Sequence, residues 1–135
     1  MDTISWEDFE KIDIRVGTII EARDFPRAKK PAYQLVIDFG EMGIKNSSAQ
    51  ITVHYSITDL IGRKVVAVVN FSPRQIANFI SECLVLGIYD ENNNVVLLAP
   101  ERNLSNGLKI GLWRSILLVL NHLWELYRFA VMNLM

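Results

Sequence analysis

The sequence is short of the residues that build metal and redox centres. Its 135 residues include one cysteine, Cys83, and two histidines, His54 and His122. A single cysteine excludes an intramolecular disulfide, and one thiol with two distant imidazoles falls short of a tetrahedral zinc site. We therefore expect no metal and no cofactor. Because Cys83 lies in an apolar run, we interpret it as a core residue in a reducing compartment.

Sequence motifs of catalysis are also missing. No nucleophile elbow is present, and Gly62-Arg63-Lys64 lacks the earlier glycine and the strand-to-helix setting of a phosphate-binding loop. We therefore predict a binding module that is not an enzyme. Two alternatives stay open on the residues alone: an enzyme whose site has no recognisable motif, and a purely structural dimerisation unit, with or without a membrane tether.

Neither sign of charge is in excess. Lysine and arginine number 14 against 15 aspartate and glutamate, for a formal net charge of −1. An overall positive charge, which would attract nucleic acid to the whole surface, is therefore excluded. Contact with RNA has to come from a local patch of basic side chains. The first residues, Met1–Asp8, are acidic and lack the apolar stretch of a signal peptide. A cytoplasmic protein is expected.

Short β-leaning segments make up most of the chain as far as residue 111. We expect strands over residues 12–23, 33–39, 44–53, 63–70, 83–89 and 95–98, and short helices at 5–11 and 56–60. The run Val65–Val69 is apolar at every position, which is typical of a strand buried on both faces. Gly17 indicates a bend or bulge in the first strand, and Asp90–Asn94 indicates a hairpin turn.

This pattern predicts an all-β fold with short helices, a five-stranded Greek-key OB-fold barrel, although other small barrels fit the pattern alone.

A further helix is expected to begin at Ser72. Serine is a favoured N-cap and Pro73 suits the first helical position. Ile76, Phe79 and Ile80 then recur at helical spacing.

A series of motifs in one order makes a more specific signal than any single motif. They are Phe9–Gly17, Lys30–Tyr33, Ile37–Gly40, Gly43–Thr52, Val68–Phe71, Pro73–Ala77, Ser81–Glu82, Leu84–Gly87 and Asn106–Gly107. The series resembles CsaA-like proteins of the tRNA-binding-domain family over about residues 6 to 111. The resemblance implies an OB-fold homodimer with export-related chaperone activity, and kinship to tRNA-binding domains on some aminoacyl-tRNA synthetases. Ser72 departs from the pattern, which usually has a second proline there.

Two candidate sites follow. For RNA, the resemblance places Asn70, Pro73, Arg74, Ser81 and Glu82 on an Asn-x-x-Pro-Arg motif and its downstream serine. The predicted RNA-binding residues are Asn70, Arg74, Ser81, Glu82, Lys45, Lys29 and Lys30. Charge contacts would supply affinity, although basic side chains are most often plain solvated surface.

For unfolded or precursor polypeptide, the candidate residues are apolar. Phe71, Pro73 and Ile76 would form the floor of a groove, and Arg74 with Lys29 and Lys30 its rim. The alternative, that these apolar residues are ordinary core or dimer contact, stays open at this point.

Residues 112–135 form a second unit with no counterpart in the resemblance, and 17 of the 24 residues are hydrophobic. On a helix, Arg114, Asn121, Glu125 and Arg128 fall on one polar stripe and the rest of the surface is apolar. We rank a packed or oligomer-forming helix first, a peripheral membrane anchor second and a spanning helix last, because the basic content is low. An extension without selected function is the remaining alternative.

Overall fold

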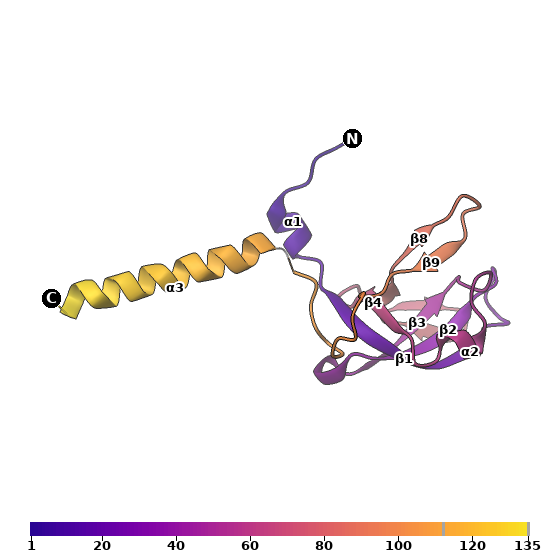
Figure 1. Cartoon of the computed structure of the whole chain (residues 1–135). Coiled ribbons are helices and arrows are strands. Elements are labelled where there is room, and N and C mark those ends of the chain that lie inside the picture. Colours follow the sequence, from indigo (N-terminus) through magenta and orange to yellow (C-terminus); the bar gives the residue numbers. More distant parts are fainter. Residues whose placement is uncertain (112, 135) are drawn as a thin grey trace.

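The computed structural model describes residues 1–111 and 113–134 (Figure 1). Its helices are α1 (Trp6–Glu10), α2 (Ile57–Leu60) and α3 (Trp113–Leu134), with a 3-10 turn η1 (Gly40–Met42). Its strands are β1 (Ile14–Asp24), β2 (Tyr33–Asp38), β3 (Ile44–Ala49), β4 (Lys64–Val68), β5 (Arg74–Ile76), β6 (Phe79–Ser81), β7 (Leu84–Val85), β8 (Gly87–Tyr89) and β9 (Val95–Leu97).

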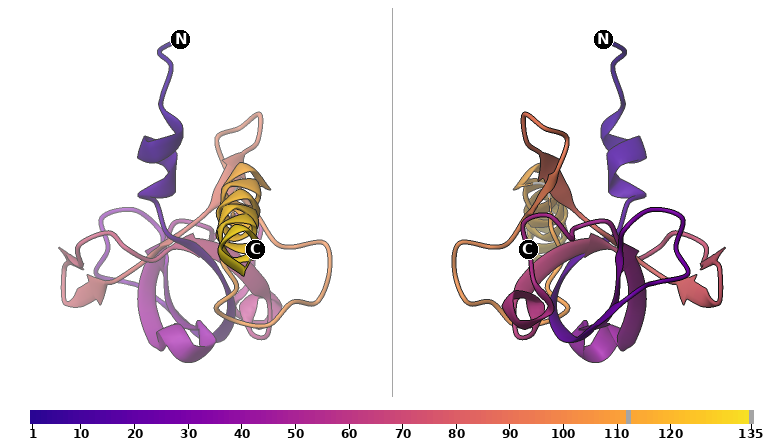
Figure 2. Two further views of the ribbon diagram at one scale, coloured as in Figure 1. Left: turned by 90° about the vertical axis from the view of Figure 1, so that its left-hand side faces the viewer. Right: turned by 90° about the vertical axis from the view of Figure 1, so that its right-hand side faces the viewer.

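Five strands form one antiparallel sheet in the order β3-β2-β1-β4-β7, curled into a nearly closed barrel (Figures 1 and 2). β1 to β3 form a meander, α2 joins β3 to β4, and β7 returns between β4 and β3. This order is that of an OB-fold. The prediction of an all-β barrel with short helices and an added C-terminal helix is confirmed.

β1 bends at Ile20, where its register with β2 shifts between Ile19 and Glu21. A bulge of this kind bends the strand and increases its twist. The first half of β1 therefore pairs with β4 and the second half with β2. Pairing of one long, bent strand with two different neighbours lets the sheet curl into a small barrel.

The predicted bend at Gly17 is wrong, because Gly17 pairs regularly with Val65. A Cβ atom at this position would lie 2.7 Å from Ile37 Cγ2 and 2.7 Å from the Phe39 ring. Real Cβ atoms essentially never approach that closely. Glycine is needed here for close packing inside the barrel, not for backbone flexibility.

β4 is buried on both faces, as predicted from its continuous apolar run. Val65 and Ala67 face the barrel interior, and Val66 and Val68 face a second cluster on the outside. The interior cluster comprises Ile19, Tyr33, Leu35, Ile37, Phe39, Ala49, Ile51, Leu60, Val65, Ala67, Val69 and Cys83. The expectation that Cys83 is a core residue is confirmed.

The second cluster is covered in part by the N-terminal segment. Phe9 and Ile12, in and just after α1, pack against it. α1 begins at a Ser5 cap, as predicted. The segment before α3 runs along β1, where the Val16 N–H donates to the Leu108 carbonyl at 2.9 Å.

The predicted helix beginning at Ser72 is wrong. β5 and β6 form a hairpin with a two-residue turn, in which Ala77 has a φ of 52°. Ile76 and Phe79 lie directly opposite each other, and residues flanking such a turn are cross-strand neighbours, so their spacing suits a hairpin as well as a helix. The Phe79 ring packs edge-on against Phe25, 5.5 Å between centroids, a tertiary contact that the local pattern does not contain.

The predicted strand over residues 83–89 is two short strands. β7 pairs with β4 in the barrel, and β8 leaves the barrel to pair with β9. The predicted hairpin around Asp90–Asn94 is confirmed. The hairpins β5–β6 and β8–β9 project from the barrel in different directions (Figure 2).

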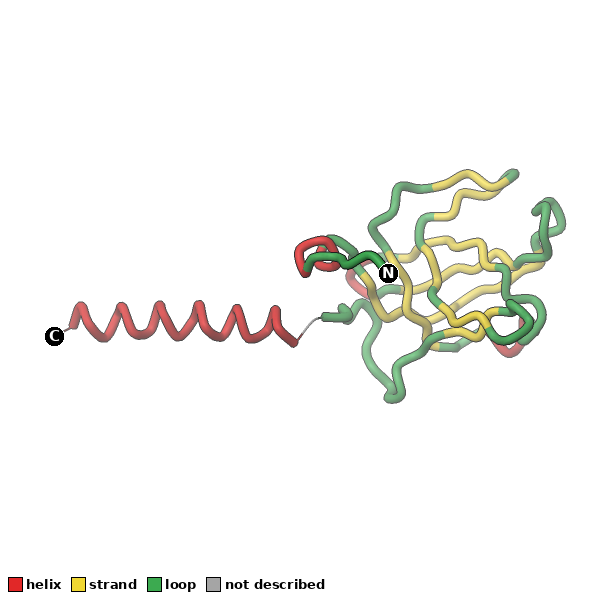
Figure 3. The backbone as a smooth tube through the Cα atoms, turned by 90° about the horizontal axis from the view of Figure 1, so that it is seen from above, coloured by secondary structure: helices red, strands yellow, loops and turns green. Residues whose placement is uncertain are grey.

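α3 is helical, as predicted, and extends away from the barrel (Figures 1 and 3). Leu112 and Met135, the ends of the predicted extension, lie outside the described residues. In the part of the chain that the structure describes, no helix is long and apolar enough to cross a membrane.

Candidate ligand-binding groove

A groove of about 780 Å³ lies between β3, β7 and the two hairpins. Its lining comprises Ser48, Ala49, Gln50, Ile51, Phe71, Ser72, Arg74, Ile76, Ser81, Glu82, Cys83, Leu84, Val85, Tyr89, Asn93 and Val95. Segments from 48 to 95 along the chain thus meet at one concave surface, which is the usual form of a ligand site.

The groove is a mixed surface with one charge of each sign. Arg74 is its cation and Glu82 its carboxylate, and most other lining side chains are apolar or carry a hydroxyl or amide. Phe71 and Tyr89 are aromatic and exposed by 56% and 73%. Exposed aromatic rings beside a few polar groups suit a chain-like ligand, whether the rings contact apolar side chains or stack on bases.

At the floor of the groove, the β3 edge of the barrel is joined to the neighbouring segment by hydrogen bonds to two side chains. The Asn46 N–H donates to Glu82 Oε1 at 3.0 Å, and the Ser48 N–H donates to Ser81 Oγ at 3.1 Å. One backbone bond accompanies them, from the Glu82 N–H to the Asn46 carbonyl at 2.8 Å. Ser81 and Glu82, both predicted to bind RNA, therefore line the groove but use these side-chain atoms to hold the β3 edge.

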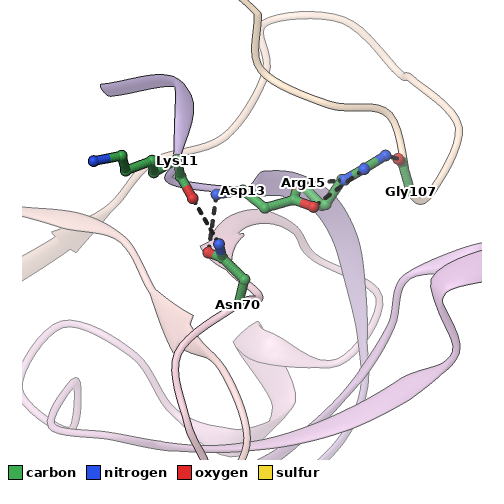
Figure 4. A network of polar contacts seen from close by, with 5 residues as sticks. All are labelled: Lys11, Asp13, Arg15, Asn70 and Gly107. Atoms are coloured by element: carbon green, nitrogen blue, oxygen red, sulfur yellow. Dashed lines mark hydrogen bonds and ion pairs between the residues drawn. The ribbon is translucent and has the colours of Figure 1, made fainter. Parts of the chain in front are cut away.

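Asn70, the first of the predicted RNA-binding residues, does not line the groove. Its amide nitrogen donates to the Lys11 carbonyl at 2.7 Å, and its side-chain oxygen accepts from the Asp13 N–H at 2.9 Å (Figure 4). The side chain thus makes two hydrogen bonds to the chain that leads into β1. Asn70 positions the N-terminal segment relative to the end of β4.

A second polar contact adjoins this one. The Arg15 guanidinium donates to both carboxylate oxygens of Asp13, at 2.6 and 3.2 Å, and to the Gly107 carbonyl at 3.0 Å (Figure 4). The hydrogen bond from Arg15 is the main reason that the pKa of Asp13 lies below its ordinary value. The pair connects β1 to the segment that precedes α3.

Among the predicted basic residues, only Arg74 lines the groove. Lys45 is half-buried on β3, and Lys29 and Lys30 are exposed in the loop between β1 and β2. The base of that loop lies beside β6 through the contact between Phe25 and Phe79. The predicted basic set is therefore dispersed around the barrel.

The predicted polypeptide-binding residues are brought together more closely. Phe71, Arg74 and Ile76 all line the groove, whereas Pro73 is exposed outside it. The alternative reading of Phe71 as ordinary core is wrong, because its side chain is 56% exposed. Ile76 is half-buried.

Sequence reasoning missed the wall formed by the β8–β9 hairpin, which contributes Tyr89, Asn93 and Val95. The sequence feature that could have indicated this wall is the aromatic Tyr89 next to the polar turn Asp90–Asn94. The wall is attached at two points to the loop after β3. His54 Nε2 lies 2.6 Å from Asp90 Oδ2, and the Leu97 N–H donates to the Tyr55 hydroxyl at 2.9 Å.

Two side chains in this region have shifted pKa values. Hydrogen bonds from the Asn94 backbone and from His54 lower the pKa of Asp90, which keeps it ionised beside His54. Burial raises the pKa of the Cys83 thiol to about 11 and so keeps it in the unreactive protonated form. Within the described residues, no group of three or more His, Cys, Asp or Glu side chains is arranged to hold a metal ion.

The barrel and its groove define a small OB-fold binding module. A comparison with protein families agrees, because the model of the family described as "Putative tRNA binding domain" matches residues 14–109. The chain belongs to this family. It is also similar to the crystal structures of the chaperone CsaA from Bacillus anthracis (52% identity, TM-score 0.78) and from Picrophilus torridus (55% identity, TM-score 0.76). Those alignments cover 82% and 81% of this chain and 100% of each CsaA chain.

Curated relatives include larger enzymes. The chain is 34% identical over 110 residues to the methionine–tRNA ligase of Methanocaldococcus jannaschii, an alignment that covers 82% of this chain and 17% of the enzyme. A second methionine–tRNA ligase, from Methanococcus aeolicus, is 37% identical over 110 residues, with 16% of the enzyme covered. The chain therefore spans about a sixth of these relatives and corresponds to one part of them.

Proposed function

We propose that this chain is a non-catalytic, chaperone-like module that holds an extended segment of unfolded polypeptide in the groove between the two hairpins. The single observation that carries the proposal is the position of Phe71 and Ile76 on one wall and Tyr89 and Val95 on the other. Apolar side chains on both walls of a groove suit apolar side chains of an incoming segment.

The charge of the groove supports polypeptide over RNA as its main ligand. Arg74 and Glu82 balance each other among the lining residues, and an RNA phosphate backbone would need a surplus of cations. The higher identity to the two CsaA chaperones than to the ligases agrees with this choice.

Binding of tRNA is the second candidate, and the family match over residues 14–109 favours it. In this role Arg74 would contact phosphate, and Phe71 or Tyr89 would stack on bases at about 1–3 kcal/mol each. Lys29, Lys30 and Lys45 would add contacts from outside the groove. Asn70, Ser81 and Glu82 would act by positioning the backbone around the site.

Three further features belong to the proposal and follow the resemblance to CsaA-like proteins. They are a homodimeric barrel, a cytoplasmic location, and clients that include proteins awaiting export. A structural dimerisation unit without ligand is the competing reading, and it predicts no binding to the groove at all.

The decisive experiment measures both ligands on one set of variants. Suppression of aggregation of a chemically denatured client protein reports polypeptide binding, and fluorescence anisotropy with labelled bulk tRNA reports RNA binding. Phe71→Ser removes an apolar groove side chain, and Ile61→Ser is its control, because Ile61 is 53% exposed and lies outside the groove. Arg74→Ala removes the cation, and Arg102→Ala, on an exposed pair with Glu101, is its control.

For polypeptide, we expect Phe71→Ser to weaken client binding by about 10- to 150-fold, since burying an aromatic side chain contributes about 1.5–3 kcal/mol. This binding should change little between low and physiological salt. Binding of tRNA through the same surface would instead weaken with salt and with Arg74→Ala. Equal binding of both ligands by Phe71→Ser, Arg74→Ala and the unmodified protein would contradict the proposed site.

A further inference from the structure

α3 presents apolar side chains to solvent over residues 122–134. All side chains from residue 122 to 134 are exposed. The large hydrophobic ones are Leu123, Trp124, Leu126, Tyr127, Phe129, Val131, Met132 and Leu134, with exposed fractions from 39% to 87%. Most of the stability of a helix in a protein comes from packing of its apolar face, and a continuous apolar surface of this size marks a site of interaction.

The sequence of α3 carries an unbroken heptad repeat. Trp113, Leu120, Tyr127 and Leu134 occupy the a positions, and Ile116, Leu123 and Ala130 occupy the d positions. Alternating spacings of three and four residues over the whole helix are typical of helices that pack side by side with a left-handed supercoil.

The apolar face is wider than a simple a/d seam. The e and g positions are also hydrophobic except at Asn133, so twelve of the thirteen residues at a, d, e and g are hydrophobic. The remaining nine positions carry Arg114, Ser115, Asn121, His122, Glu125 and Arg128 and only three hydrophobic residues. One partner helix covers a narrow seam, whereas a face of this width is covered in a bundle of several helices.

We infer that α3 is a self-assembly helix, and that its partners are the α3 helices of other copies of this chain in a discrete bundle. Its direction allows this, because α3 leads away from the barrel and a bundle would hold the barrels at its end (Figure 3). This inference goes beyond the proposed ligand binding and does not depend on it.

Charge argues against a membrane as the partner. The helix has two arginines and one glutamate, and each basic residue near an anionic surface contributes only about 1 kcal/mol. Arg128 lies three residues from Glu125, about one helical turn away on the polar side of the helix, which further reduces attraction to anionic lipid.

The test uses the full chain with two matched double variants. Leu123→Lys with Tyr127→Lys places two charges on the heptad seam. Phe129→Lys with Met132→Lys places two charges on the opposite side, at side chains of similar exposure: 55% and 62% for the first pair, 67% and 64% for the second. Both pairs lie outside the two clusters of the barrel core, so the barrel should fold in each variant. Mass is measured by light scattering after size exclusion at micromolar concentration.

We expect the unmodified chain and the Phe129/Met132 variant to share one discrete mass, at least twofold that of the Leu123/Tyr127 variant. The lower mass is then the state set by the barrel alone. Equal mass for all three proteins, equal dissociation by both variants, or aggregates of indefinite size would each overturn the inference. So would transfer of the unmodified chain to phosphatidylcholine–phosphatidylglycerol vesicles without any self-association in their absence.

Discussion

The side-chain oxygen of Asn70 accepts a hydrogen bond from the backbone N–H of Asp13, which lies 57 positions earlier in the chain. The amide nitrogen of the same side chain donates to the Lys11 carbonyl. Asn70 thereby fastens the chain entering β1 to the chain leaving β4 (Figure 4). The next residue, Phe71, lines the groove.

Asn70→Ala should lower the free energy of unfolding by about 1 kcal/mol, because two backbone groups lose their partners where water can partly replace them. Urea denaturation measures this. Asn92→Ala, at an exposed turn position, is the control and should change stability by less than about 0.5 kcal/mol. Unchanged stability of Asn70→Ala with a loss of tRNA binding would instead make Asn70 a ligand contact.

Glu82→Ala should destabilise the barrel by about 1–3 kcal/mol, since the Asn46 N–H at the β3 edge loses its acceptor. Glu82→Gln keeps an oxygen at the same place and should lose less than about 1 kcal/mol. Chemical denaturation compares the two, with Glu91→Ala in the exposed β8–β9 turn as the control. Similar losses for Ala and Gln would show that the negative charge matters more than the hydrogen bond.

Gly17→Ala should destabilise by about 1–3 kcal/mol, because the new methyl group overlaps Ile37 and Phe39 inside the barrel. Gly111→Ala is the matched control, because a Cβ there meets no atom within 4 Å. Thermal unfolding of the two variants gives the comparison. Equal thermal stability of Gly17→Ala and the unmodified protein would mean that the barrel accommodates the added methyl group beside Ile37 and Phe39.

Asp13→Asn should flatten the dependence of stability on acid pH. The pKa of Asp13 is lower in the folded protein than its ordinary value of 3.8, so the pair with Arg15 stabilises fully above that value and is lost as pH falls through the folded value. At pH 7 the substitution should lose about 1 kcal/mol. Urea titrations at pH 7 and pH 3 test both statements, and an unchanged acid slope would contradict them.

Much of the barrel was predictable, because most strands are alternating or continuous apolar runs bounded by turn residues. Val65–Val69 is the clearest case, since a strand buried on both faces is typically apolar at every position. The hairpin at β5–β6 was not predictable. Ser72 and Pro73 are sound helix-start residues, and the hairpin is favoured by contacts with distant segments, such as Phe79 with Phe25 and Ser81 with the β3 edge.

The candidate site was predictable in part. The loop from Phe71 to Ile76 was located from the sequence, and three of its four proposed polypeptide contacts line the groove. The opposite wall was missed, because Tyr89 and Val95 come from a hairpin whose direction relative to the barrel is a tertiary property. The side chains of Ser81 and Glu82 were placed in the right region, although local sequence does not show that they close the β3 edge.

By itself, the order of apolar, polar and turn residues determined that this chain forms a small strand-rich barrel followed by a strongly apolar helix. Those features depend on near neighbours along the chain, which set side-chain period and turn geometry. Tertiary structure alone decided which side chains are left exposed beside the groove and which are used to close the barrel. That division depends on contacts between residues far apart in sequence, such as Asn46 with Glu82 and Asn70 with Asp13, and no local pattern encodes them.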